Sequence, residues 1–192
     1  MVFLNLSSVF EQKSVNEQVI TVISGTNRSG NLSILVSRAV VELLTAQGIE
    51  TKLLDLQTLP EDFAFKNEVY SNSSAKLKRI IPSYIGKADR FVFVIPEYNG
   101  SFPGVCKAFI DAVKPDRFRS KKACIVGISS GRAGNLRGAD HLTGILNYLN
   151  VAVFPKHVNI THVDGQVDES GRINSASTQE LLERSLKSFV DF

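Results

Sequence analysis

The chain has 192 residues, of which 43% are hydrophobic and 21% charged, and its formal net charge is +3. This length and apolar content predict one domain with a substantial core and exclude two full-sized domains. The basic residues are dispersed, which argues against nucleic-acid binding, and we expect no membrane span because no apolar run reaches about 18 residues.

The chain is expected to begin with an extension, followed by a strand and a helix. Residues 1–17 lack the basic start and apolar core of a secretory signal. We predict that they form an N-terminal extension to one domain of residues 18–192. β-branched residues at 19–23 predict a buried strand. Apolar residues at helical spacing over 32–44 predict a helix, which Gly48 ends.

The loop between this strand and this helix is suited to bind phosphate. Gly25 permits a tight turn, and the first N–H groups of the helix carry the positive end of its dipole. The loop adds side-chain donors and a positive charge, from Thr26, Arg28, Ser29, Asn31 and Ser33.

Two other phosphate-binding motifs do not match this loop. A P-loop requires Lys and Ser/Thr where this chain has Asn31 and Leu32, and a dinucleotide fingerprint requires glycine in the place of Asn27. A single terminal phosphate, such as that of FMN, therefore suits the loop best. The alternative interpretation is an ordinary strand-to-helix turn capped by Asn or Ser.

The rest of the chain alternates between predicted strands and helices. Further strands are expected at residues 51–56, 91–95, 122–128 and 151–154, with 158–163 as a candidate extension of the last. Helices are expected from Ser73 or Ser74 to 87, over 103–113, over 142–149 and over 177–189, and an exposed turn at 164–172. This alternation predicts an α/β three-layer sandwich with a parallel sheet covered on both faces.

Polar, glycine-containing loops follow three of the strands, at residues 25–33, 96–102 and 129–137. The carboxyl ends of parallel strands share one edge of a sheet, where ligands bind in open α/β folds. The second loop has two prolines and two glycines within 96–104, and it offers amides and an aromatic ring to a flat heterocycle. A proline-bounded loop without a ligand is the alternative interpretation.

Three strings, GTNRSGNLS, PEYNGSFPGVCKAFID and ISSGRAGNLRG, stand at these three strand ends. In this order they resemble the NADPH-dependent FMN reductase family of flavodoxin-like proteins, which includes azoreductases, quinone reductases and chromate reductases. The resemblance covers residues 19–154. It implies a five-stranded parallel sheet of order 2-1-3-4-5, FMN at the carboxyl edge of the sheet, and a homodimer or homotetramer.

The resemblance also implies the residues that would bind FMN. The first loop would hold the phosphate through Thr26, Arg28, Asn31 and Ser33, with Leu32 beside them. The second would contact the ribityl chain and the flavin ring through Pro96, Glu97, Tyr98, Asn99, Gly100 and Ser101. The third would lie by the pyrimidine side of the ring, with Ser129, Ser130, Gly131 and Gly134.

The predicted function is that of an FMN-dependent NAD(P)H oxidoreductase. NADPH or NADH would pass a hydride to FMN, and a quinone, azo compound, metal ion or free flavin would take the electrons, without a catalytic side chain. Arg28, Arg132 and Arg137 are candidates to meet the 2′-phosphate of NADPH.

Two alternatives stay open. The first is an FMN-binding electron carrier that docks to protein partners without nicotinamide turnover. A pI of about 8.9 disfavours it, since such carriers tend to be strongly acidic. The second is a flavin-binding sensor or scaffold.

The cysteines and histidines receive structural interpretations. Cys106 and Cys124 lack CxxC spacing and stand in apolar surroundings, which predicts buried, reduced thiols in a cytoplasmic protein. His141 is expected on a helix, as a surface or partly packed residue. His157 and His162 flank a strand without a third ligand at metal spacing, so no metal site is expected.

Overall fold

The computed structural model describes residues 18–60, 63–66, 75–168, 170 and 172–192. The predicted N-terminal extension, residues 1–17, lies outside the described residues, as do the predicted capping residues Ser73 and Ser74. Within the part that is described, no helix is long and apolar enough to cross a membrane.

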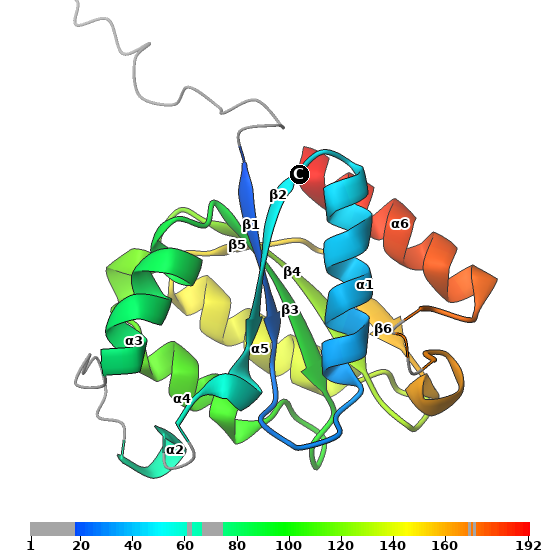
Figure 1. Ribbon diagram of the computed structural model, residues 1–192, viewed down its shortest axis with the longest axis horizontal. Helices are drawn as coiled ribbons and strands as arrows, with labels where there is room; N and C mark the ends of the chain where they lie inside the picture. Colours follow the sequence, from blue (N-terminus) through cyan, green and yellow to red (C-terminus); the bar gives the residue numbers. More distant parts are fainter. Residues whose placement is uncertain (1–17, 61–62, 67–74, 169, 171) are drawn as a thin grey trace, which may run out of the picture.

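A parallel sheet forms the middle layer of the molecule (Figure 1). Its strands are β1 (Val19–Ser24), β2 (Glu50–Asp55), β3 (Arg90–Pro96), β4 (Lys122–Ile128), β5 (Ala152–Val153) and β6 (Val158–Ile160). The order is β2-β1-β3-β4-β5, and β6 also pairs with β4. β5 pairs with the start of β4 and β6 with its end, so the two share the fifth position of the sheet. The predicted strand order is therefore confirmed, including the extension of the fifth strand.

Helices cover both faces of the sheet. They are α1 (Ser33–Ala46), α2 (Phe63–Lys66), α3 (Ala75–Ile80), α4 (Gly104–Ala112), α5 (Leu136–Tyr148) and α6 (Ala176–Asp191). α1 and α6 lie on one face, and α3, α4 and α5 lie on the other (Figure 1). This arrangement confirms the three-layer sandwich.

Side chains of β3 show why the sheet needs cover on both faces. Alternate residues of a strand point to opposite faces. Phe91, Phe93 and Ile95 accordingly enter the core under α3, α4 and α5, whereas Val92 and Val94 enter the core under α1 and α6. An entirely apolar strand is stable only in this central position, because both of its faces are then removed from water.

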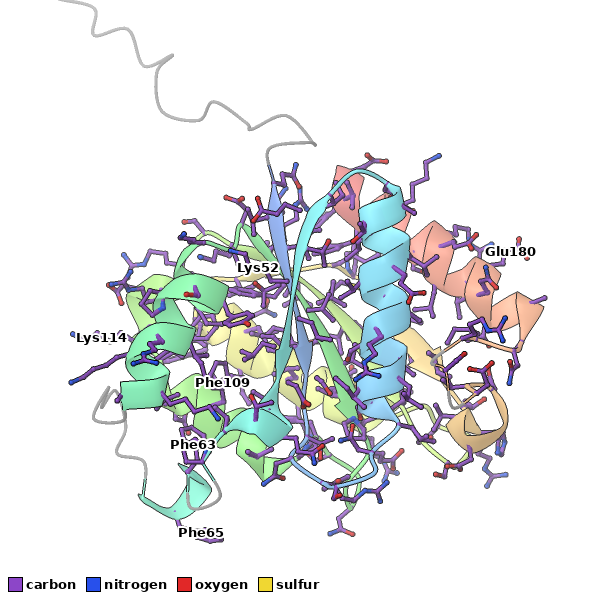
Figure 2. All side chains as sticks on the ribbon, in the orientation of Figure 1. Lys52, Phe63, Phe65, Phe109, Lys114 and Glu180 are labelled. Carbon is purple, nitrogen blue, oxygen red and sulfur yellow. The ribbon has the colours of Figure 1, made fainter. Side chains whose placement is uncertain are left out.

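Two helical segments differ from the sequence prediction. The helix predicted to reach residue 87 is α3 followed by a π-helical segment, Ile81–Gly86, because Pro82 has no N–H to continue the regular helical hydrogen bonds. The short helix α2 was not predicted. It is held by Phe63, which is buried against α4, while Phe65 points away from the protein and is 94% exposed (Figure 2).

Candidate cofactor site

Three loops meet at the carboxyl edge of the sheet, the lower edge in Figure 1. We call them loop 1 (residues 25–32, after β1), loop 2 (residues 97–103, after β3) and loop 3 (residues 129–135, after β4). The strands that carry them are neighbours in the order β1-β3-β4, so the fold brings together all three segments that the sequence singled out.

Loop 1 begins at a glycine because the next strand leaves no room for a side chain. The Gly25 N–H donates to the carbonyl oxygen of Val94 at 2.9 Å. A Cβ atom on Gly25 would lie 2.8 Å from Cγ2 of Ile95. The chain therefore leaves β1 pressed against β3, which directs loop 1 toward loop 2.

Asn31 determines the shape of the rest of loop 1. Its side-chain oxygen accepts from the Ile34 N–H at 3.0 Å, which caps the start of α1. Its amide nitrogen donates to the Arg28 carbonyl at 2.7 Å and approaches the side-chain oxygen of Gln57 at 3.4 Å. The residue is 4% exposed. The Asn31 amide thus organises the loop, and Gln57 is a supporting residue that the sequence analysis missed.

A side-chain hydrogen bond joins loop 1 to loop 2. The hydroxyl groups of Thr26 and Tyr98 are 2.9 Å apart, and the Arg28 N–H donates to the Thr26 hydroxyl at 3.3 Å. Thr26 is fully buried. This pair fixes the position of the Tyr98 ring relative to the turn that opens α1.

Loop 2 contains a tight reverse turn at its tip. Tyr98 and Ser101 exchange backbone hydrogen bonds, with the Tyr98 N–H donating at 2.8 Å and the Ser101 N–H at 3.0 Å. The two residues between them, Asn99 and Gly100, have φ of 50° and 76°. Positive φ at both positions is what a type I′ turn requires, and Asn-Gly is the sequence that best adopts it. The loop is therefore rigid by local chemistry.

Loop 3 is closed on itself and tied to β6. The Ser129 hydroxyl accepts from the Gly134 N–H and donates to the Gly131 carbonyl, both at 2.9 Å. The Ser129 N–H donates to the carbonyl oxygen of Ile160 in β6 at 3.0 Å. At the end of the loop, the Asn135 side chain donates to the Ile95 carbonyl of β3 at 3.1 Å. Loop 3 is thus held by strands on both of its sides.

Ser101 makes a contact that the sequence did not indicate. Its hydroxyl lies 3.0 Å from Nδ1 of His141, an exposed residue on α5. Forty residues separate the two along the chain, so no local motif could reveal the pair. His157 has a different partner, the Thr143 hydroxyl at 3.2 Å. No group of three metal-ligating side chains occurs among the residues that the structure describes.

Buried side-chain oxygens without hydrogen-bond partners gather at these loops. Among the described residues there are three: Ser24 at the end of β1, Ser33 at the start of α1, and Asn135 just before α5. A buried, unsatisfied polar atom costs about 1–3 kcal/mol and indicates an absent partner. All three belong to residues near the carboxyl edge of the sheet, and all three are closed to solvent in this structure.

The charge around the loops favours an anion. The first turns of α1 and α5, which are described in full, hold no acidic residue to compete for the positive ends of these helices. Three arginines are exposed around the loops, namely Arg28, Arg132 and Arg137. Nη1 of Arg137 lies 3.9 Å from where a Cβ of Gly100 would stand, which places this guanidinium beside the turn of loop 2.

The predicted site residues differ in how far they reach the surface. Thr26, Asn31, Ser33, Ser129 and Gly134 are buried. Leu32, Pro96, Glu97, Tyr98, Gly100 and Ser101 are half-buried, and Arg28, Asn99, Ser130 and Gly131 are exposed. The half-buried and exposed side chains lie at the surface of the three loops, and the buried ones lie within them.

Two hollows adjoin the loops. A cavity of about 180 Å³ lies beside loop 1, between Asn27, Pro60 and Val105. A groove of about 350 Å³ runs between α4 and α5, with Ile110 and Ile145 among its apolar residues and Lys107, Asp111 and His141 among its polar ones. His141 therefore links this groove to loop 2.

The residues present fit FMN. A helix start without acidic residues, a loop of hydroxyl and amide groups and an exposed arginine are the groups that hold a terminal phosphate. Loops 2 and 3 add backbone amides and the half-buried Tyr98 ring at the same edge, which suits a flat, polar-edged ring system.

Known proteins resemble this chain over most of its length. The sequence profile of the NADPH-dependent FMN reductase family matches residues 19–165. An NAD(P)H-dependent FMN reductase of Pseudomonas aeruginosa is 31% identical over 169 residues, which cover 86% of this chain and 89% of that protein. A 2-hydroxy-1,4-benzoquinone reductase of a Burkholderia species is 26% identical over 176 residues, which cover 89% of this chain and 93% of that protein.

A solved structure has the same fold. The flavoenzyme NAD(P)H:(acceptor) oxidoreductase of Paracoccus denitrificans superposes with a TM-score of 0.77 at 21% identity. The superposition covers 91% of this chain and 96% of that one.

Proposed function

This chain belongs to the NADPH-dependent FMN reductase family, and from that membership we propose the cofactor-binding residues, the acceptor and the assembly of an FMN-dependent NAD(P)H oxidoreductase. Nothing in the comparisons favours the FMN-binding electron carrier. The observation that supports the binding site is the meeting of loops 1, 2 and 3, with their hydroxyl, amide and arginine groups, at one edge of the sheet.

The phosphate of FMN is assigned to loop 1. Arg28 supplies a positive charge that stays exposed to solvent, and Thr26 and Ser33 supply hydroxyl groups. Asn31 supports the site indirectly, because its amide is engaged in capping α1 and closing the loop. Leu32 adds apolar contact at the helix start.

The ring system is assigned to loops 2 and 3. The type I′ turn holds Asn99 and Gly100 in one conformation, so their amides are oriented before the ligand arrives. Gly131 and Ser130 are exposed on loop 3, where backbone N–H groups stabilise negative charge on a bound ring. Pro96 and Glu97 continue β3 into the site.

When bound, FMN would supply the redox chemistry, in which a hydride is taken from the nicotinamide and electrons are passed to the acceptor. The protein's part is to bind, to orient and to exclude water, which is why no acid–base pair is required in the three loops. Arg28, Arg132 and Arg137 are the candidates to contact the 2′-phosphate of NADPH, since an arginine fork binds phosphate in a bidentate way.

We assign a quinone as the acceptor class ahead of an azo compound, a metal ion or free flavin. The benzoquinone reductase of the Burkholderia species aligns with 89% of this chain, which supports that choice. The apolar groove between α4 and α5, next to the 84% exposed Tyr148, supports a homodimer or homotetramer. The free, buried thiols of Cys106 and Cys124 support a cytoplasmic location.

Flavin absorbance tests the proposal. The purified protein, after incubation with FMN and gel filtration, is expected to be yellow, to bleach when NADPH or NADH is added without oxygen, and to regain its colour on addition of benzoquinone. Heat-denatured protein with the same free FMN is the control. A protein that retains no FMN overturns the site, and one that retains FMN without bleaching is a carrier.

A further inference from the structure

A histidine outside the three loops lies within hydrogen-bond distance of a hydroxyl inside them. Ser101 is the last residue of the type I′ turn in loop 2. Its hydroxyl oxygen lies 3.0 Å from Nδ1 of His141, which α5 presents to solvent. Ser101 itself is half-buried at the cofactor edge, and its resemblance to the family's loop assigns it to the flavin site.

The direction of this hydrogen bond depends on the protonation of the ring. A hydroxyl has one hydrogen to donate, and Nδ1 of imidazole is either an acceptor or a donor. When Nδ1 carries no proton, Ser101 donates to His141 and offers only lone pairs to the ligand. When the ring is protonated, His141 donates to Ser101, and the serine hydrogen is free to point to the ligand.

We propose that His141 is a positioning residue that sets whether the Ser101 hydroxyl donates or accepts toward bound FMN. This inference rests on the proposed function. Protonated His141 turns Ser101 into a donor to the carbonyl and ring-nitrogen acceptors of the flavin, and it brings a positive charge next to loop 2. Neutral His141 with its proton on Nε2 accepts from Ser101 and withdraws that donor.

The surroundings allow a proton to reach the ring. His141 lies at the groove between α4 and α5 and is exposed. On α4, Lys107 and Asp111 line the same groove and pair with each other at 2.8 Å, so their charges largely cancel. On α5, Asp140 is its neighbour in sequence and Arg137 precedes it by one helical turn. On loop 2 the facing group is the uncharged Ser101.

Binding of FMN to the apo-protein tests this role without turnover. FMN affinity is measured from the quenching of flavin fluorescence at about pH 5.5 and about pH 8. The FMN phosphate also titrates in this interval, so the measured quantity is the ratio of dissociation constants, Ser101→Ala over wild type, at each pH. We expect this ratio to be about fivefold larger at the lower pH, as one hydrogen bond to the ligand is gained.

Two variants separate the role from general effects of pH. In a His141→Asn background the amide keeps a hydrogen bond to Ser101 but does not titrate, and the ratio is expected to be the same at both pH values. His157→Asn removes another histidine with a hydroxyl partner, Thr143, and should leave the wild-type change intact.

Each outcome decides the question. A ratio that does not change with pH in the wild type, or that changes equally in the His141→Asn background, overturns the role of His141 while leaving FMN binding in place. Failure of the wild type to bind FMN at either pH overturns the proposed function and this inference with it. Circular dichroism checks that each variant is folded, which we expect because His141 is exposed and Ser101 and His157 are only half-buried.

Discussion

At the scale of single residues, the hydroxyl of Ser33 allows the most direct test of the proposed site. This oxygen is buried and lacks a hydrogen-bond partner among the described residues. Such a group destabilises the protein that carries it, by about 1–3 kcal/mol. The proposed site therefore gives Ser33 a role in ligand binding at a cost to the stability of the free protein.

Replacing Ser33 by alanine should move stability and binding in opposite directions. The apo-protein is expected to unfold at the same or a higher urea concentration, because an unsatisfied buried oxygen is removed. FMN affinity is expected to fall about tenfold, as a hydrogen bond to a charged phosphate is lost. Chemical denaturation of the apo-protein and fluorescence titration with FMN measure the two effects.

Ser37 supplies the matched control for this variant. It lies one turn further along α1, is equally buried, and its hydroxyl donates to the Ser33 carbonyl at 2.7 Å. Ser37→Ala should lower stability slightly and leave FMN affinity unchanged. If Ser33→Ala destabilises the apo-protein and binds FMN normally, the Ser33 hydroxyl has no role toward the phosphate.

At the scale of elements, loop 3 depends on close backbone packing. Gly134 has φ of 56°, and a Cβ there would lie 2.8 Å from the backbone carbon of Asn159 in β6. The Asn159 side chain in turn donates a hydrogen bond to the Gly134 carbonyl oxygen at 2.9 Å. The loop is thus pressed onto the segment that forms the fifth sheet position.

Gly134→Ala should open loop 3. A left-handed conformation costs a non-glycine residue roughly 1–2 kcal/mol, and overpacking costs about 1–3 kcal/mol more. We expect the free energy of unfolding to fall by about 2 kcal/mol or more, together with FMN affinity. Gly131→Ala is the control for stability, because it belongs to the same loop and its Cβ would meet no atom within 4 Å. Equal losses of stability in both variants would contradict the packing argument.

Local chemistry explains which elements could be predicted from the sequence. The order of strands and helices follows from hydrophobic periodicity, and the flavodoxin-like order came from the resemblance carried by the three loops. The hydrogen bonds of Thr26 with Tyr98 and of Ser101 with His141 could not be predicted, because they join residues 72 and 40 positions apart. The π-helical continuation of α3 was missed because the missing N–H of Pro82 changes the helical hydrogen bonds, and hydrophobic periodicity does not reveal that change.

At the scale of the whole molecule, the sheet separates two hydrophobic cores. Cys106 belongs to the core under α3, α4 and α5, and Cys124 belongs to the core under α1 and α6. Burial raises the pKa of each thiol to about 12. Both cysteines are therefore protonated in the folded protein at neutral pH, as their apolar surroundings led us to expect.

The two buried thiols are expected to lower the free energy of unfolding as the pH becomes alkaline. An unfolded cysteine has a pKa of about 8.5. Above that pH the unfolded chain releases thiol protons that the folded chain keeps, so stability that is fully present below about pH 8.5 is lost as the pH rises toward 12. In this range each thiol should lower the free energy of unfolding by about 1.4 kcal/mol per pH unit.

Denaturation in urea between pH 8 and pH 10 measures this slope. Other groups also titrate there, so the informative quantity is the difference from the Cys106→Ala and Cys124→Ala variants. Each variant should show a shallower decline than the wild type by the contribution of one thiol. Identical slopes in all three proteins would mean that the thiols ionise freely in the folded state.

The division of the fifth sheet position between β5 and β6 has a consequence for synthesis on the ribosome. Loop 3 is held by backbone hydrogen bonds from Ser129 to Ile160, from Val163 to Ser129 and from His162 to Gly131. A nascent polypeptide that has emerged only as far as α5 contains loop 1 and the hydrogen bond from Asn135 to Ile95 of β3, but it lacks the bonds between loop 3 and the β6 segment. We therefore expect loop 3 to be held on both of its sides, and FMN to be bound, only after β6 has been translated.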